Sequence, residues 1–301
     1  MLSISTSWMG PDIKIWDWLA KVRDLGFDAV ELSYKITAEQ LKEAEKHLGP
    51  TGLKVSSIHN FCPLPDDEPS GRHPSNYYRL SSLDEHERQQ AIKWTKIAVD
   101  TARRVDAAVV VIHAGTADVE DERCPKLFDL YVSGKKDSDA FKKERARVLK
   151  LREEKKGPYL AALEKSLREL IPYSRSKNIT IGLETRYYPL EVPDFEEIGR
   201  FLKMFGRREM GYWHDVGHAE MNSRLGIKPH KAFLESYKDR LIGVHVHGIK
   251  DRRDHLAPFE GDMDLNQWLP YFGPNVVKVV ESKPFASEKL IKEAVKRLKA
   301  V

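Results

Sequence analysis

Four short apolar runs, each ending in a carboxylate or an imidazole, constrain the fold of this chain more than any other feature. They are ITIGLE at 179–184, GYWHD at 211–215, LIGVHVH at 241–247 and VVKVVE at 276–281. Their last residues are Glu184, Asp215, His247 and Glu281. A buried parallel strand is apolar along its length because helices cover the sheet, and polar functional side chains collect at its carboxyl end. The four runs therefore predict parallel strands whose ends share one site.

The same alternation of apolar runs and amphipathic segments covers the whole chain. Earlier strand candidates are LSIST at 2–6, FDAVELS at 27–33, LKVSSIH at 53–59 and AAVVVIH at 107–113. Eight strands that alternate with helices form either a doubly wound sheet or a closed barrel. No GxGxxG or GxxxxGK[ST] motif follows the early strands, and only a closed barrel brings the ends of strands three to eight to one centre. We therefore expect an α/β fold of the (β/α)8 TIM barrel class.

The length fits one domain. Barrels of this class commonly occupy about 250 residues, so we expect a single domain over residues 1–301. The rhythm of strands and helices is broken at about 114–157, which we interpret as an insertion beside the mouth of the barrel or as a lid.

Composition and charge favour a small-molecule partner over nucleic acid. The net charge is +4, and basic and acidic residues are interleaved, so a basic nucleic-acid footprint is not favoured. Cys62 and Cys124 show no pairing framework, which is typical of a reducing compartment. No apolar run approaches the ~20 residues of a membrane span, and the first residues lack the pattern of a signal peptide. We expect a cytoplasmic protein; a homo-oligomer is compatible with the sequence, which does not set the number of subunits.

The four terminal side chains predict a metal site. Two glutamates, an aspartate and a histidine suit Mn²⁺ or Mg²⁺, which we favour, with Zn²⁺ as an alternative. His245 and His247 are two residues apart and share one face of a strand, so both compete for the imidazole position. We favour His247 because it lies nearer the strand end, and His245 stays open.

The motifs VELS, SSIHNF, VVIHAG, GLETR, HDVGHAEM, HVHGIKDRR, FEGDMD and VVES carry a resemblance to a known superfamily. The chain resembles the xylose-isomerase-like barrels, which include sugar isomerases, ketose 3-epimerases, inosose dehydratases and endonuclease IV. The resemblance implies that Glu184, Asp215, His247 and Glu281 hold one divalent ion. It also implies that Glu184 and Glu281 move protons, and that His218 and Arg253, or its neighbour Arg252, contact the substrate.

This resemblance implies a metal-dependent isomerase or epimerase. A sugar or sugar-like polyol would react by proton transfer through an enediolate, with the cation polarising its oxygens. Two departures from the family pattern concern the substrate loop. HVHGIKD has one extra residue between histidine and lysine, and Phe259 replaces the glycine that often follows proline in the loop after strand seven.

Two alternatives stay open. One is an endonuclease IV-like zinc phosphodiesterase. The histidines at positions that resemble its additional zinc ligands are His59, His113, His218 and His255. Asp251 or Asp254 would be their companion. The other is an inosose dehydratase-like lyase. For His59, His113 and His255 we favour substrate contact at the barrel mouth over metal ligation.

Three further side chains are candidates for substrate contact. We expect Trp8 and Phe61 to pack against a sugar, since both follow strands. Arg186 follows the GLET motif and could either contact an anionic group of the substrate or pair with a carboxylate at the rim.

Overall fold

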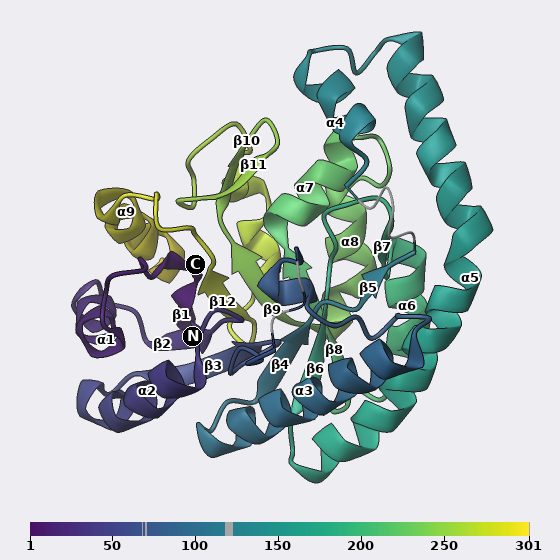
Figure 1. Cartoon of the computed structure of the whole chain (residues 1–301). Helices are drawn as coiled ribbons and strands as arrows, with labels where there is room; N and C mark the ends of the chain where they lie inside the picture. The colour runs from purple at the N-terminus through teal and green to yellow at the C-terminus, as the bar shows by residue number, and fades with distance from the viewer. Residues whose placement is uncertain (68, 70, 118–122, 301) are drawn as a thin grey trace.

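The computed structural model describes residues 1–67, 69, 71–117 and 123–300. Eight parallel strands close into a barrel in the order β1-β12-β9-β8-β6-β4-β3-β2 (Figure 1). Their bounds are β1 Leu2–Ser5, β2 Ala29–Leu32, β3 Lys54–His59, β4 Val109–Ile112, β6 Thr180–Glu184, β8 Met210–Asp215, β9 Leu241–Val246 and β12 Val277–Val280. The predicted TIM barrel is confirmed.

Helices surround this barrel on the outside (Figure 1). Their bounds are α1 Ile15–Asp24, α2 Ala38–Thr51, α3 Glu85–Arg104, α4 Pro125–Val132, α5 Asp139–Ser176, α6 Phe195–Met204, α7 Val216–Arg224, α8 His230–Tyr237 and α9 Glu288–Lys299. Their apolar faces, such as Ile291, Val295 and Leu298 of α9, are buried against the strands. None of the helices in the described ranges has the length and apolarity that crossing a membrane requires.

The interior of the barrel is filled by side chains. Trp213 of β8 is fully buried and packs in one cluster with Val109, Val111 and Val279. The indole fits because the neighbouring strand carries Gly243, where an added Cβ would lie 2.1 Å from Trp213 Cζ3. The ring of His245 contacts this tryptophan edge to face, with ring centroids 5.3 Å apart and an interplanar angle of 68°. A packed layer of side chains therefore forms the floor beneath the polar strand ends.

The segment between β4 and β6 departs from the simple repeat. β5 (Gly115–Thr116) pairs antiparallel with β7 (Glu191–Val192), and α4 packs against α5. We expected the insertion to end at 157, but α5 continues through Gly157 and Pro158 as one helix of 38 residues. Figure 1 shows α4 and the adjoining half of α5 projecting beyond the barrel. Residues 118–122 of the expected insertion lie outside the described residues, and the lid role stays a prediction.

A buried ion pair attaches this long helix to the barrel's outer layer. Arg152 of α5 donates from Nη1 and Nη2 to the two carboxylate oxygens of Glu197, at 2.7 and 2.6 Å. Its Nη1 also lies 2.9 Å from Asp194, the residue that caps α6. Because Arg152 and Glu197 are both buried, the side chains fix how α5 sits on α6.

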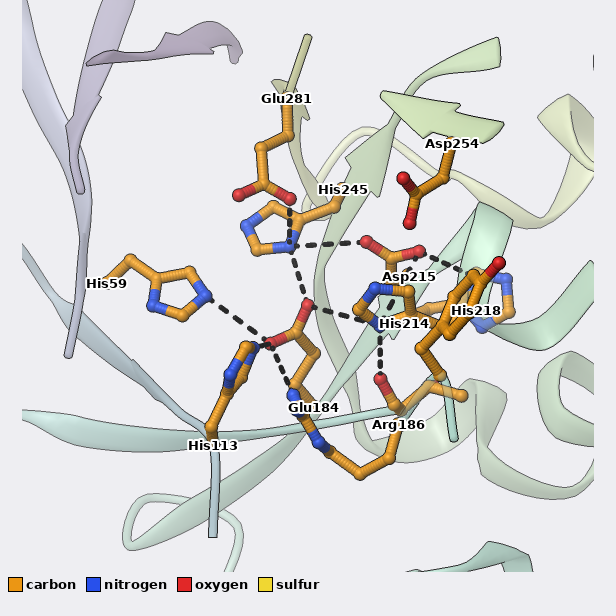
Figure 2. A network of polar contacts seen from close by, with 12 residues as sticks. His59, His113, Glu184, Arg186, His214, Asp215, His218, His245, Asp254 and Glu281 are labelled. Carbon is orange, nitrogen blue, oxygen red and sulfur yellow. Dashed lines mark hydrogen bonds and ion pairs between the residues drawn. The ribbon is translucent and has the colours of Figure 1, made fainter. Parts of the chain in front are cut away.

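A small hairpin follows β9. β10 (Gly248–Lys250) and β11 (Arg253–Leu256) pair antiparallel at the carboxyl end of the barrel. They bring Asp254 and His255 towards the strand ends (Figure 2 shows Asp254).

Candidate functional site

Four buried side chains meet at the carboxyl end of the barrel. They are Glu184 at the end of β6, Asp215 at the end of β8, His245 in β9 and Glu281 directly after β12, and their ligand atoms all lie within 4.8 Å of one another. His245 Nδ1 is central to the group: it lies 2.9 Å from Glu184 Oε1, 3.3 Å from Glu281 Oε2 and 3.7 Å from Asp215 Oδ2 (Figure 2).

The chemistry of these donors fits a divalent cation. Three carboxylates confined within a few ångströms repel one another, and burial removes the water that would screen them. A cation at the common centre would neutralise that charge, and oxygen ligands with one imidazole suit Mg²⁺, Mn²⁺ or Zn²⁺. The arrangement therefore could hold one divalent ion, whose identity the donors do not fix.

The imidazole in this group is His245, whereas we favoured His247. β9 ends at Val246, so His247 already lies in the turn towards β10. Its ring stays on the other side of Asp215, with Nε2 3.1 Å from Oδ1 and 3.2 Å from Oδ2, and its Nδ1 accepts a hydrogen bond from the amide of His255. The structure therefore groups His245, not His247, with the three carboxylates, and which imidazole binds an ion stays a prediction.

His59 and His113 approach Glu184 from the side opposite His245. Nε2 of His59 and of His113 lie 3.4 Å and 2.7 Å from Glu184 Oε2 (Figure 2). These three residues form a second group that could hold a metal ion. Glu184 therefore lies between two clusters of donors, one on each of its oxygens.

A third group lies beside Asp215. Asp215 caps α7, since its Oδ1 accepts a hydrogen bond from the amide of His218 at 2.7 Å. This helix begins directly after β8, and the sequence patterns did not predict it. It brings His218 next to Asp254 and His255, and the three could together hold an ion. The cavity at the mouth is lined by His218, His255, His59 and His113, and their contact with substrate stays a prediction.

The two glutamates have opposite pKa shifts. Burial alone raises the pKa of a carboxyl. At Glu184 the imidazoles of His113 and His245 outweigh burial and hold the pKa well below its usual value. At Glu281 burial dominates, and the carboxylates of Glu184 and Glu31 add to it, so the pKa is raised despite His245 and His59. In the metal-free chain, Glu184 is the stronger and Glu281 the weaker acid.

The structure adds Glu31, which the sequence patterns did not single out. It lies in β2, is fully buried, and reaches His245 Nε2 at 3.2 Å while accepting a hydrogen bond from Ser57 at 2.8 Å. The available signal was a lone carboxylate inside the apolar strand AVEL. Such a residue needs a buried partner, but the sequence does not say which one.

Three residues that we expected to contact substrate do not line this cavity. Trp8 donates its indole N–H to Ala286 O at 2.9 Å, and Phe61 is buried near Tyr78; neither is among the residues that line the cavity. Arg253 points outwards, with its guanidinium 4.1 Å from the ring centre of Phe285, and its neighbour Arg252 lines the cavity instead.

The glycine-replacing residue in the loop after β9 has an unusual backbone. Phe259 adopts a φ of 69°, in the left-handed region that glycine favours. The guanidinium carbon of Arg297 lies 3.4 Å from the centre of the Phe259 ring, and this cation–π contact stabilises the loop conformation.

Comparison with known proteins places the fold. The family described as xylose isomerase-like TIM barrel matches residues 19–301. The chain is similar to 3-keto-D-glucoside 4-epimerase from E. coli, with a TM-score of 0.69 at 14% identity over 100% of this chain and 99% of that one. It is similar to a D-tagatose 3-epimerase-like protein, with a TM-score of 0.67 at 17% identity over 99% and 97% of the two chains.

An AP endonuclease of family 2 from Brucella melitensis is also similar, with a TM-score of 0.63 at 13% identity over 99% of this chain and 98% of that one. At these identities the solved structures establish the barrel fold, which hosts several chemistries. No curated protein matches the chain.

Proposed function

Because the chain belongs to the xylose isomerase-like TIM barrel family, we propose that it is a divalent-metal-dependent isomerase or epimerase of a sugar or sugar-like polyol. The observation that carries the proposal is the grouping of Glu184, Asp215, His245 and Glu281 around one point at the mouth of the barrel. A divalent ion bound there would polarise a carbonyl and an adjacent hydroxyl of the substrate.

Glu184 and Glu281 are the groups that move protons. β6 and β12 are separated in the barrel by β8 and β9, so the two carboxylates approach the centre from different sides. One takes a proton from carbon and the other returns a proton to the opposite face, which epimerises that carbon through an enediolate. Return of the proton to the neighbouring carbon gives an isomerase.

Solvent exchange tests this proposal directly. A panel of ketoses and their phosphates is incubated with the Mn²⁺-loaded protein in D₂O, and deuterium at the carbon next to the carbonyl is measured by NMR. We expect incorporation in the wild type and a loss of at least 100-fold in Glu184→Gln and in Glu281→Gln. Circular dichroism establishes that both variants fold. Exchange that persists in both variants contradicts the assignment.

A second candidate, a phosphodiesterase, is favoured by one specific observation. His59 and His113 with Glu184, and His218 with Asp254 and His255, form two further groups beside the first. Additional ions would clamp a phosphodiester and supply a nucleophile near neutral pH.

Elemental analysis of the purified protein separates the two candidates. One Mn²⁺ or Mg²⁺ per chain supports the isomerase. Two or three Zn²⁺ per chain, with nicking of abasic-site DNA that disappears in His59→Ala and His113→Ala, would replace it with the phosphodiesterase. Measured DNA affinity must then fall with salt, as phosphate contacts require.

A further inference from the structure

The cavity above the candidate metal centre is lined by both carboxylates and cations. It has a volume of about 350 Å³, enough for a small phosphorylated sugar. Its lining carboxylates are Glu184, Glu191, Asp254 and Glu281. Its lining cations are Arg72, Arg79, Arg123, Arg186, Arg252 and Lys283. Three of the four carboxylates belong to groups that could hold metal ions, so they are engaged when ions are bound.

Several of these cations already have carboxylate partners. Arg72 and Arg79 both pair with Glu87, at 2.7 and 3.2 Å, outside the cavity. Arg252 Nη1 lies 3.9 Å from Asp129. Arg186 and Lys283 differ from these three among the described residues: Arg186 keeps two buried donors without a partner, and Lys283 has no carboxylate within 4.0 Å.

Arg186 is held rigidly with donors to spare. Its Nη2 donates to Glu191 Oε1, and the other oxygen of Glu191 accepts hydrogen bonds from the amides of Tyr187 and Tyr188 at 3.0 and 2.8 Å. The side chain is 5% exposed, yet Nε and Nη1 have no hydrogen-bond partner within the described ranges. Nη1 lies 3.6 Å from Glu184 Oε2, at the edge of the metal-ligand group (Figure 2). Buried donors left unpaired are costly, so this arrangement is suited to a ligand oxygen.

Lys283 offers a second cation on the Glu281 side of the cavity. It follows Glu281 by two residues, and its Nζ donates to the hydroxyl of Tyr34 at 3.1 Å. An ammonium has three donors, so Tyr34 uses one of them. In the part of the chain that the structure describes, Lys283 makes no ion pair with a carboxylate within 4.0 Å.

We infer that the substrate carries a phosphate group, which Arg186 and Lys283 recognise from the two sides of the metal-ligand group. This inference rests on the proposed function and narrows its substrate class to phosphorylated compounds. A guanidinium with two free donors matches phosphate oxygens, and a second cation matches the second negative charge of a phosphomonoester. A neutral sugar would leave Lys283 without a counter-charge and would offer the two unpaired donors of Arg186 no anionic acceptor.

Calorimetric titration of the metal-loaded protein with inorganic phosphate tests the inference. We expect Lys283→Met and Arg186→Lys each to weaken phosphate binding at least tenfold. Arg186→Lys keeps the positive charge beside Glu191 but removes the planar set of donors. Lys35→Met is the matched control, because Lys35 is a neighbouring cation of Lys283 that does not line the cavity; it should bind within twofold of the wild type.

Metal content per chain is measured for every variant. Phosphate that binds to the ion itself then contributes equally to the compared affinities. Binding within twofold of the wild type in either Lys283→Met or Arg186→Lys overturns the inference. If Arg186→Lys fails to fold, Lys283→Met alone decides.

Paired probes separate this inference from the proposed function. D-Fructose 6-phosphate should undergo deuterium exchange with a KM at least tenfold below that of D-fructose, and Lys283→Met should abolish that difference. Exchange with equal KM values for the two probes sinks the phosphate inference and keeps the isomerase. Cleavage of bis(p-nitrophenyl) phosphate without any exchange, weakened in Lys283→Met, sinks the isomerase and keeps phosphate recognition, with a diester as its source.

Discussion

Nε2 of His245 lies 3.2 Å from Oε2 of Glu31, on the side of the ring that faces away from Glu184. The two residues are 214 positions apart in the chain and both are fully buried. A carboxylate on the outer nitrogen of a metal-binding imidazole fixes the orientation and the tautomer of that ring. Glu31 is therefore positioned to support His245 as a ligand without touching the ion itself.

Replacement of Glu31 should weaken metal binding without changing the number of ions. We expect Glu31→Gln to lower Mn²⁺ affinity by about 10- to 100-fold, as is usual for the outer partner of a metal-binding histidine. Isothermal titration calorimetry measures both affinity and stoichiometry. Glu39→Gln, an exposed change on α2, serves as the control and should leave the affinity unaltered. Unchanged affinity in Glu31→Gln would show that His245 needs no such support.

The two histidines of β9 and its following turn should differ in their effect on metal content. His245→Gln removes a donor from the centre of the group, so we expect that site to lose its ion. His247→Gln removes the contact to Asp215 and the acceptor of the His255 amide but no donor of the central group, so the ion should stay, with an affinity lowered about 10-fold or more. Elemental analysis after dialysis provides the measurement. The reverse pattern would reinstate His247 as the ligand.

Metal binding should release a proton. Burial disfavours a charged imidazole, but the carboxylates of Glu281, Glu31 and Glu184 hold the pKa of His245 well above its usual value. The ring is therefore protonated at pH 7 in the metal-free chain, and a ligand nitrogen must be unprotonated. We expect release of about one proton per ion at pH 7 and an affinity that rises with pH until the pKa of His245 is passed.

Calorimetry in two buffers of different ionisation enthalpy measures this release. The number of protons should decline towards zero at a pH above the pKa of His245. A release near zero at pH 7 would mean that the metal-free ring is already neutral.

The ion pair beneath α5 should be important for stability. Arg152→Ala leaves Glu197 buried without its bidentate partner, which costs about 3–5 kcal/mol. The control is Lys150→Ala on the same helix, where an exposed side chain lies 3.7 Å from Glu154; its effect should stay within about 0.5 kcal/mol. Urea unfolding followed by circular dichroism compares them. Equal stabilities of the two variants would show that the pair does not hold α5 in place.

The floor of the site should not tolerate a methyl group at position 243. A Cβ there would lie 2.1 Å from Trp213 Cζ3, so we expect Gly243→Ala to destabilise the barrel by about 1–3 kcal/mol through overpacking. In a Trp213→Leu background the indole is absent and the cost should shrink, which a double-mutant cycle by thermal or chemical unfolding detects. An equal cost in both backgrounds would place the strain in the backbone instead.

Much of the fold was predictable from local patterns. A strand covered on both sides is apolar throughout, and eight such runs alternating with amphipathic helices leave few topologies. The unbroken α5 was not predictable in this way, because Gly157 and Pro158 resemble a helix boundary. Ion pairs along the helix and the buried contact of Arg152 with Glu197 favour its continuation.

The sequence by itself determined the barrel and three of the four side chains that meet at its centre, because both depend on residue type at strand ends. Only the tertiary structure brought His245, rather than His247, into the group with the three carboxylates and brought Glu31 to His245. Both histidines share the alternation of the strand, and the choice depends on where β9 ends and turns. Contacts such as Arg186 with Glu191, or Glu31 with His245, depend on closure of the barrel and on loop conformation, which no local pattern encodes.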